Sequence, residues 1–397
     1  MNIIAGTSQE PRITLKKGRD KAVRNRHHWI FSGAVQQPLP KFENGIILPV
    51  YSAEGNFLGS AYCNTKTSIF GRMVAFGSTS PLEAIKRHIL QAVEFRRRLF
   101  NPSVTNAFRI INSEGDLLPG LIADVYNDTI VIQITTLGME KLKPFIADVL
   151  KESCNPYCMY EKSNLPVRAE EGLPDSQGVL YGSLPEQVRI KENGFSFIVD
   201  IVNGQKTGFY LDQREMRKLI GTLCTGKRVL NCFSYTGGFS VYAAGNGAVS
   251  VDSVDSSAPA VELAQKNLSI NPHSAHCGFF VDDVFTFLRG RPLEYDVIIL
   301  DPPAFAKRKD DVIQACRGYK DINRLALSTM PPGSILFTSS CSYYIDEELF
   351  QKVVFEAAVE AHRNVRIIQK HHLASDHPLN IFHPEGNYLK SLVLYVE

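Results

Sequence analysis

Residues 228–239 read Arg-Val-Leu-Asn-Cys-Phe-Ser-Tyr-Thr-Gly-Gly-Phe, and this stretch indicates the fold class. Its first half is typical of a buried β-strand, and the two glycines lead into a helix over residues 239–244. Glycines at the carboxyl end of a first strand let the backbone approach a ligand. The fingerprint G-x-G-x-x-G is absent, so the loop predicts a nucleoside ligand without phosphates rather than a dinucleotide.

Strands and helices alternate from about residue 191 to the last residues of the chain. Strands are predicted at 195–201, 227–232, 248–254, 277–281, 295–300, 334–339 and 389–396, with helices between them. This alternation predicts an α/β fold, a doubly wound and mainly parallel sheet with helices on both faces.

Acidic residues follow the second and third strands of this sheet. Asp255 lies 17 residues after Gly238, close to the spacing expected of a ribose-binding acid. Asp252 is the alternative, but it lies inside the strand, where its side chain points sideways, so we favour Asp255. After the third strand we expect Asp283, rather than Asp282, to accept a hydrogen bond from an adenine amino group. Ser256 or Ser257 is predicted to cap the helix that follows Asp255.

The fourth strand, 295–300, ends in Asp301-Pro302-Pro303-Ala304-Phe305. Two prolines stiffen the backbone there, so a flat base can rest against the loop and Phe305. A simple strand-to-loop stop is the alternative interpretation. The ordered series of glycine loop and acids resembles class I S-adenosylmethionine methyltransferases, and Asp-Pro-Pro-aromatic resembles a motif of those that act on nucleobases.

Cys341 lies between two serines at the carboxyl end of the next strand. A lone cysteine usually fills a core, but this one is expected to face the ligand edge. A thiolate that adds to carbon 6 of cytosine or uracil makes carbon 5 able to attack a methyl sulfonium. The target base must first leave its stack. We predict Cys341 as the nucleophile and Asp301 as the group that holds or protonates the ring; the base that takes the final proton is not identified.

Composition sets the remaining limits. A chain of 397 residues predicts two or three domains, and 44% hydrophobic with 21% charged residues is typical of a globular protein. No apolar stretch approaches the length of a membrane span. The eight cysteines lack the spacing of a disulfide framework or a zinc site, so we expect free thiols, a cytoplasmic location and no metal.

The N-terminal part is basic and rich in predicted strands. Residues 1–78 hold ten Lys or Arg and four Asp or Glu, a net charge of +6, which leaves −4 for the rest of the chain. Strands are predicted at 46–51 and 57–62, with a basic edge over 16–28. This small β module predicts an anionic partner, and a solvated charged face is the alternative.

Residues 79–190 are predicted to form a mixed α+β unit. Ser80 and Glu83 suggest a capping box for a helix to about residue 100, whose Lys86, Arg87, Arg96, Arg97 and Arg98 are expected on its surface. Further elements are predicted as strands at 108–112, 121–126 and 129–135 and a helix at 141–151.

Long motifs in one order along nearly the whole chain carry a family resemblance. They are Lys17–Arg19, Arg26–Ala34, Lys206–Arg214, Val229–Phe239, Asp301–Pro303, Cys316–Asn323, Ser340–Ser342 and Pro384–Gly386. Together they resemble the ribosomal RNA large subunit methyltransferase I family, which makes a 5-methylcytosine.

The resemblance implies three domains: an RNA-binding PUA domain over 1–78, a central domain over 79–190 and a Rossmann-like methyltransferase domain over 191–397. It implies S-adenosylmethionine as cofactor, ribosomal RNA as partner, Cys341 as nucleophile and a homodimer without membrane contact. The expected cofactor-binding residues are Gln213, Asn231, Phe233, Ser234, Tyr235, Thr236, Gly237, Asp255, Asp283, Asp301 and Pro302. The expected RNA-binding residues are Lys17, Arg19, Arg24, Arg26, Phe305 and Lys320.

Two positions depart from what the family usually has. His28 stands where proline is usual, and Ala304 follows Asp-Pro-Pro where many RNA cytosine methyltransferases have a second cysteine. A relative that methylates guanine nitrogen 7 looks to lack a cysteine at the position of Cys341. The alternatives are therefore methylation of uracil carbon 5 or guanine nitrogen 7, or an inactive RNA-binding relative.

Overall fold

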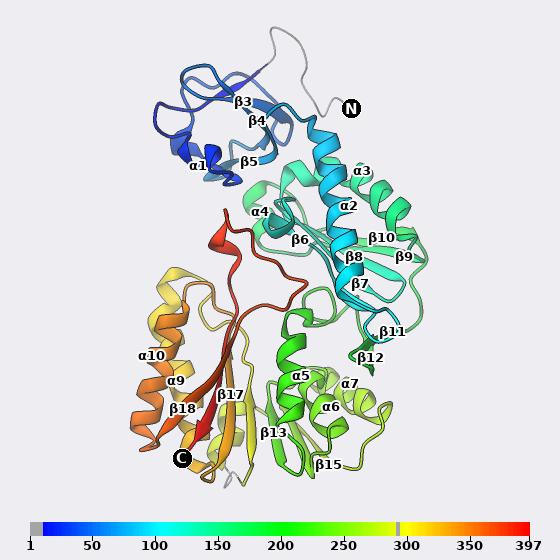
Figure 1. Ribbon diagram of the computed structural model, residues 1–397, viewed down its shortest axis with the longest axis vertical. Helices are drawn as coiled ribbons and strands as arrows, with labels where there is room; N and C mark the ends of the chain where they lie inside the picture. Colours follow the sequence, from blue (N-terminus) through cyan, green and yellow to red (C-terminus); the bar gives the residue numbers. More distant parts are fainter. Residues whose placement is uncertain (1–10, 291–293) are drawn as a thin grey trace. The chain divides into compact units, whose positions relative to one another are not determined.

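The computed structural model describes residues 11–290 and 294–397, which form two compact units (Figure 1). The first unit holds the chain to Ile190 together with the segments Val199–Phe209 and Ser375–Gly386. The second unit holds Lys191–Ile198, Tyr210–Ala374 and Asn387–Glu397. The predicted domain boundaries after residues 78 and 190 stay predictions.

The N-terminal sheet of the first unit has five strands in the order β1-β3-β4-β5-β2. β1 pairs parallel with β3, and the remaining pairs are antiparallel. The predicted strands at 46–51 and 57–62 are confirmed. The elements are β1 Ile13–Thr14, α1 Lys21–Arg24, β2 Trp29–Phe31, β3 Ile47–Tyr51, β4 Phe57–Cys63 and β5 Ile69–Phe76.

His28 lies in the core of this N-terminal sheet, only 1% exposed. Its Nδ1 is 2.8 Å from the carbonyl oxygen of Met73, so the neutral ring donates there. Burial is the main cause that lowers the pKa of His28 to about 4. The residue that replaces the usual proline is therefore a histidine held without charge.

We expect acid to destabilise the protein through His28. Below pH ~6.5 the ring of His28 binds a proton in the unfolded chain, whereas in the folded protein it binds one only below about pH 4. The unfolded state then binds more protons, so stability that is full above pH ~6.5 is lost as the pH falls, by roughly 3 kcal/mol. His28→Gln, which can still donate to Met73, should flatten denaturation curves between pH 4 and 6.5. The control His273→Gln should lose stability in acid as the wild type does. If His28→Gln loses stability in acid as steeply as this control, the assignment to His28 is wrong.

The second sheet of this unit has the strand order β10-β9-β8-β7-β6. Its core is shared with α2 and α3, whose Ile85, Ile89, Leu142 and Ile146 are fully buried. The predicted elements of this unit are present, while β9 and β10 were not foreseen. The bounds are α2 Pro81–Leu99, β6 Ala107–Asn112, β7 Leu121–Tyr126, β8 Thr129–Ile134, α3 Leu137–Cys154, β9 Cys158–Lys162, α4 Val167–Glu171 and β10 Gln177–Gly182.

Two expectations for α2 are wrong. Ser80 occupies the N-cap position, but its side chain accepts no capping hydrogen bond, so the capping box is not formed. Arg96 is fully buried rather than part of the basic surface. Its guanidinium replaces water with carboxylate and carbonyl partners, which removes the cost of burying a charge.

A hairpin precedes the large sheet of the second unit. β11 (Val188–Glu192) pairs with β12 (Phe195–Val199), so the strand expected at 195–201 belongs to this two-stranded sheet and not to the parallel one. Asn193 and Gly194 have φ angles of 50° and 88°, the left-handed pair that a two-residue hairpin turn requires. Asn267 accepts the Ile198 N–H at 2.7 Å, so α7 rather than a strand satisfies that β12 group.

The large sheet confirms the predicted α/β fold class. Its seven strands run in the order β15-β14-β13-β16-β17-β19-β18 and are parallel except for β19, which is antiparallel to both neighbours. The edge strand β18 was not predicted. The bounds are β13 Arg228–Cys232, β14 Ser250–Asp255, β15 His276–Val281, β16 Val297–Leu300, β17 Ser334–Ser340, β18 Val365–His371 and β19 Lys390–Val396.

Helices connect these strands and flank the sheet (Figure 1). The chain runs outward from β13 through β14 to β15 and then returns to β16, beside β13. Because crossovers between parallel strands are right-handed, this reversal places a ligand crevice at the carboxyl ends of β13 and β16. The helices are α5 Arg214–Thr222, α6 Gly238–Gly245, α7 Ala258–Ser269, α8 Val284–Gly290, α9 Val312–Thr329 and α10 Glu347–Glu360.

Within residues 11–290 and 294–397, no helix is suited to cross a membrane. None of the helices there combines the length and the apolar character that crossing a bilayer demands.

Candidate active site

The loop after β13 has an unusual backbone. Phe233, Tyr235 and Gly237 have φ angles of 56°, 45° and 79°, so every second residue is left-handed. Such a conformation costs roughly 1–3 kcal/mol for a residue with a side chain and is kept where the surroundings impose it. The Ser234 N–H donates to the Val254 carbonyl at 3.0 Å, which ties the loop to β14. The strain lies at the edge of the sheet where a ligand is expected.

The two glycines of this loop are needed for packing. A Cβ at Gly237 would lie 2.9 Å from the Cβ of Ala264 in α7, and one at Gly238 would lie 3.0 Å from the Arg217 side chain in α5. Real Cβ atoms essentially never come as close as the contact at Gly237, and the contact at Gly238 is tighter than most. Glycine therefore lets α6 begin close against its neighbouring helices, a reason that differs from the ligand approach expected from the sequence.

Asp255 lies against the same loop. Its two oxygens accept the backbone N–H groups of Tyr235 and Ser257, each at 2.9 Å. An ionised carboxylate has about four acceptor positions, so roughly two remain for a ligand. Asp252 instead accepts the Tyr295 hydroxyl at 2.6 Å, as expected of a residue inside the strand. Ser257 caps α7 by accepting the Ala260 N–H, which confirms the predicted cap.

Asp283 is exposed at the start of α8, where its Oδ1 accepts the Thr286 N–H at 2.9 Å. Asp282 is half-buried and accepts the Asp283 N–H at 2.8 Å. Both acids thus lie at the carboxyl end of β15, and the role expected of Asp283 stays a prediction.

Buried acceptor atoms surround the loop. Gln213 donates its amide to Asp301 at 3.0 Å, and Asn231 donates to Ser240 at 2.8 Å. Their amide oxygens are buried and have no hydrogen-bond partner among the described residues, nor do the hydroxyls of Ser234 and Thr236. Buried polar groups are usually paired, so these atoms are candidates to bind a polar ligand.

The two segments predicted to react lie together at the ends of β16 and β17. The Ser339 hydroxyl donates to Asp301. The sulfur of Cys341 lies 3.9 Å from the carbonyl oxygen of Pro302, and the Ser342 hydroxyl accepts the Ala306 N–H at 3.1 Å. Cys341 is half-buried, so its thiol lies at this edge rather than deep in packed hydrocarbon.

Phe305 and Lys320, the two residues of the second unit that were predicted to contact RNA, already contact other side chains of the protein. The Phe305 ring packs on Tyr319 at 4.6 Å between centroids and closes over Gly318, which leaves the side chain half-buried. Lys320 pairs with Glu360 at 2.7 Å. Contact with RNA through Lys320 requires this surface pair to open.

The basic edge of the first unit lies around α1. Lys17, Arg19 and Arg26 are exposed, and within the described part of the chain no ion pair involves them. Arg24 is exposed too, but pairs with Asp20 and lies 3.8 Å from Glu54. Three of the four predicted cations are therefore available for an anionic partner.

Lys390 in β19 is a polar residue of this site that was not predicted. It is 3% exposed and lies opposite Ser340 in the register of β17 and β19. A lysine within the apolar run Leu389–Val396 is a sequence signal for a buried cation with a special partner. The sequence does not show which residues that partner would be. They follow from the register of β17 and β19, which places Lys390 opposite Ser340.

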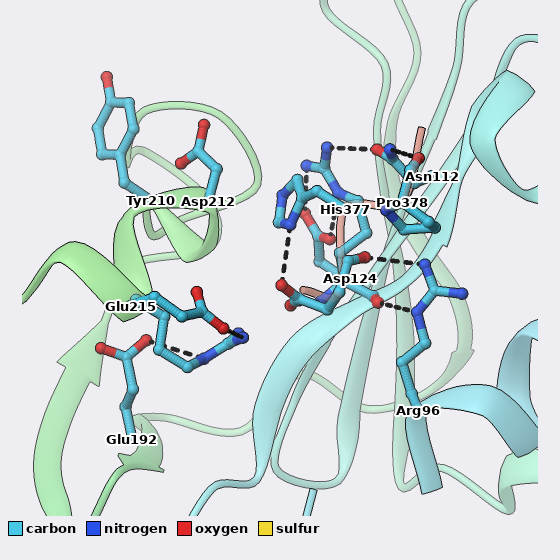
Figure 2. Close-up of polar contacts among 12 residues, drawn as sticks. Arg96, Asn112, Asp124, Glu192, Tyr210, Asp212, Glu215, His377 and Pro378 are labelled. Carbon is cyan, nitrogen blue, oxygen red and sulfur yellow. Dashed lines mark hydrogen bonds and ion pairs between the residues drawn. The ribbon is translucent and has the colours of Figure 1, made fainter. Parts of the chain in front are cut away.

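Segment Ser375–Gly386 belongs to the first unit and is held there by polar contacts (Figure 2). Arg96 forms a two-pronged pair with Asp116 at 2.6 and 2.7 Å and donates to the Asp376 carbonyl at 2.8 Å. Asp376 accepts the Arg109 N–H at 2.7 Å, and Asn112 donates to the Pro378 carbonyl at 3.0 Å. Buried charge-assisted bonds therefore fix this segment.

His27, His383 and Glu385 gather where this segment meets the N-terminal sheet. Ligand-type atoms of the three lie within 4.8 Å of one another. His27 Nδ1 accepts the Trp29 N–H at 3.1 Å, so a neutral His27 carries its proton on Nε2, which is 3.3 Å from Glu385. Because a metal ligand needs an unprotonated nitrogen, this arrangement favours a hydrogen bond over a metal site.

Comparison with known proteins agrees with the fold. A family model described as S-adenosylmethionine-dependent methyltransferase matches residues 165–371, and one described as PUA-like domain matches residues 13–76. Ribosomal RNA large subunit methyltransferase I of Aliivibrio fischeri (strain ATCC 700601 / ES114) is 42% identical over 97% of this chain and 99% of its own. The protein of that name from Aeromonas salmonicida (strain A449) is 41% identical over 96% and 98%.

Solved structures give the same relationship. A candidate SAM-dependent methyltransferase from Streptococcus mutans has a TM-score of 0.81 and 25% identity, over 97% of this chain and 99% of its own. SMU.776, a candidate methyltransferase solved in complex with SAH, has a TM-score of 0.82 at 25% identity, with the same coverage.

The residues at the sheet edge fit S-adenosylmethionine, which supplies a methyl group on a sulfonium when bound. The orphaned amide oxygens of Gln213 and Asn231 can accept from an ammonium group, and Asp255 retains acceptor positions for hydroxyls. With 42% identity over nearly its full length to a curated relative, the chain belongs to the ribosomal RNA large subunit methyltransferase I family of S-adenosylmethionine-dependent methyltransferases.

Proposed function

We propose that the protein transfers a methyl group from S-adenosylmethionine to carbon 5 of a cytosine in large-subunit ribosomal RNA, through a covalent bond to Cys341. The observation that carries the proposal is the position of the Cys341 sulfur, 3.9 Å from the Pro302 carbonyl at the strand end that holds Asp301. The printed names of the relatives support the class of RNA.

The proposed reaction has a defined role for each group. The Cys341 thiolate forms a bond to carbon 6, and the electron pair displaced to carbon 5 forms the new bond to the methyl group, whose bond to the donor sulfur breaks and leaves a neutral thioether. A base then removes the carbon 5 proton, the bond between carbon 6 and the Cys341 sulfur breaks, and the thiolate is released. Asp301, fixed by Gln213 and Ser339, holds or protonates the ring.

We propose the cofactor contacts from the same geometry. Asp255 accepts from the ribose hydroxyls, Asp283 from the adenine amino group, and Gln213 from the amino-acid end. Asn231, the loop residues Phe233–Gly237 and Pro302 complete the cofactor surface. The buried acceptors of Gln213, Asn231, Ser234 and Thr236 support this assignment because they lack partners within the described residues.

Bisulfite sequencing of ribosomal RNA from strains with and without the protein tests the proposal. We expect one 5-methylcytosine signal in large-subunit RNA to disappear with the protein. Mass mapping of nucleosides from the same RNA detects the alternatives, since loss of 5-methyluridine or 7-methylguanosine instead refutes cytosine as the substrate. Calorimetry without any heat of S-adenosylmethionine binding points to an inactive RNA-binding relative.

RNA binding is expected to depend on salt through the basic edge of the first unit. Replacing Lys17, Arg19 and Arg26 by alanine should lower the slope of log affinity against log salt by roughly 2–3, because each phosphate contact contributes about 0.7–0.9. Filter binding of a ribosomal RNA fragment at several salt concentrations measures it. Lys227→Ala, just before the amino end of β13, is the control. An unchanged slope in the triple variant means that this edge faces solvent only.

A further inference from the structure

Lys390 is held in one position by the two strands that carry the reacting segment. Its ammonium nitrogen donates to the carbonyl oxygen of Ser342 at 2.7 Å and to that of Tyr388 at 2.8 Å. Its Cα lies opposite Ser340 in the antiparallel pairing of β17 with β19. The side chain therefore ties β19 to Ser342, the residue that follows Cys341, while its backbone lies opposite Ser340, the residue that precedes it.

The two carbonyl bonds leave one position on the Lys390 nitrogen. An ammonium group has three N–H donors, and a neutral amine has two with a lone pair in the third position. Both forms can keep the bonds to Ser342 and Tyr388. The third position can therefore gain or lose a proton while the side chain stays in place.

Few charged groups act on this nitrogen. Burial lowers the pKa of Lys390 to about 8, while Cys341 and, to a smaller extent, Asp346 act in the opposite direction. Asp346 lies at the N-cap of α10, where its carboxylate already accepts the Leu349 N–H at 2.8 Å. Cys341 is thus the leading electrostatic partner of the lysine.

Other titratable groups face Cys341 from neighbouring elements. Tyr210 precedes α5, and Tyr319 in α9 bonds to the Ser342 hydroxyl at 3.0 Å. Burial raises the pKa of both phenols, that of Tyr319 to about 12, so both stay neutral at physiological pH. Asp301, which accepts from Gln213 and Ser339, lies at the end of the neighbouring strand β16. The cation of Lys390 is therefore the group able to favour a thiolate here.

We propose that Lys390 is a positioning residue that holds Cys341 as a thiolate, through its fixed ammonium group beside the 340–342 segment. The proton of the thiol passes to solvent, the thiolate that remains is paired with the ammonium group, and no other bond changes. The inference rests on the proposed function, because it assigns a purpose to the same sulfur. Its direct consequence, a thiol that is reactive at neutral pH, does not require methyl transfer and can be tested without RNA.

The test is the rate at which iodoacetamide alkylates Cys341 at different pH values, followed by mass spectrometry of its peptide. Lys390→Met removes the amine and keeps an unbranched chain. An opposite charge nearby favours an ionised form by about 1–3 pH units, so we expect the midpoint of the rate profile to rise by at least ~1 unit and the rate at pH 7 to fall roughly tenfold. Lys370→Met, on the exposed neighbouring strand β18, is the matched control and should match the wild type.

Lys390→Arg provides an independent arm in case the methionine variant fails to fold. Arginine keeps a positive charge at every pH tested, so alkylation should remain fast at pH 7. A midpoint in Lys390→Met equal to that of the wild type, or one raised equally in Lys390→Arg and in Lys390→Met, overturns the inference. If the lysine controls alkylation but RNA containing 5-fluorocytosine traps no adduct, the proposed function fails while the pairing of Lys390 with Cys341 stands.

Discussion

Replacing Cys341 by alanine is expected to abolish methyl transfer to RNA, with a loss of at least about 1,000-fold in kcat. Without the sulfur no bond to carbon 6 can form, and carbon 5 of the cytosine stays a poor nucleophile. Incubation with cofactor and RNA that contains 5-fluorocytosine should trap a covalent adduct with the wild type and none with the variant. Gel shift under denaturing conditions measures the adduct, and transfer of a labelled methyl group measures the rate.

Cys316→Ala is the matched control for this experiment. Cys316 is also half-buried in the second unit, but burial raises the pKa of its thiol and it lies in α9, away from the reacting segment. We expect adduct formation and methyl transfer near wild-type levels. Trapping by Cys341→Ala at the wild-type level, with cofactor binding intact, removes the covalent mechanism.

Replacing Arg96 by methionine is expected to lower the free energy of unfolding of the first unit by about 3–5 kcal/mol. The change removes the cation that pairs with Asp116 and one donor from each of the carbonyls of Arg109 and Asp376, at a side chain that is fully buried. Removing one partner of a buried pair costs more than the pair itself contributes, because the other charge stays desolvated. Urea denaturation followed by circular dichroism measures the change.

Arg98→Met in the same helix provides the control for Arg96. Arg98 is exposed and, among the residues described by the structure, pairs only with Glu94 one turn earlier, a type of contact that contributes about 0.3–0.5 kcal/mol. A similar small effect for both variants would show that Arg96 does not hold the 375–386 segment.

The order of strands and acids in the second unit could be predicted because local chemistry decides it. Asp301 follows the continuous apolar run Val297–Leu300, Asp255 ends a stretch in which valines recur among polar residues, and Ser257 has the position and side chain of a helix cap. The periodicity of buried strands therefore indicated the sheet edge at which the candidate site lies. The sequence did not show which side chains touch at that edge. Those contacts depend on the register of the parallel strands.

Other features depend on contacts between residues that are distant in the chain. Arg96 was expected on the surface with the other basic residues of α2, and its burial is explained by Asp116 and by the carbonyls of Arg109 and Asp376. Lys390 gained a role only once β19 was seen beside β17. The left-handed φ angles of Phe233 and Tyr235 oppose their residue types, so tertiary contacts impose them. By contrast, the Asn193-Gly194 hairpin turn was a local signal that went unused.

The position of β19 has a consequence for synthesis of the protein. This strand lies between β17 and β18, yet it follows every other strand of the sheet along the chain. Because chains emerge amino end first, the interior of the sheet stays open until β19 leaves the ribosome. Lys390 arrives with the same strand, so a nascent chain that already carries Cys341 still lacks its proposed partner.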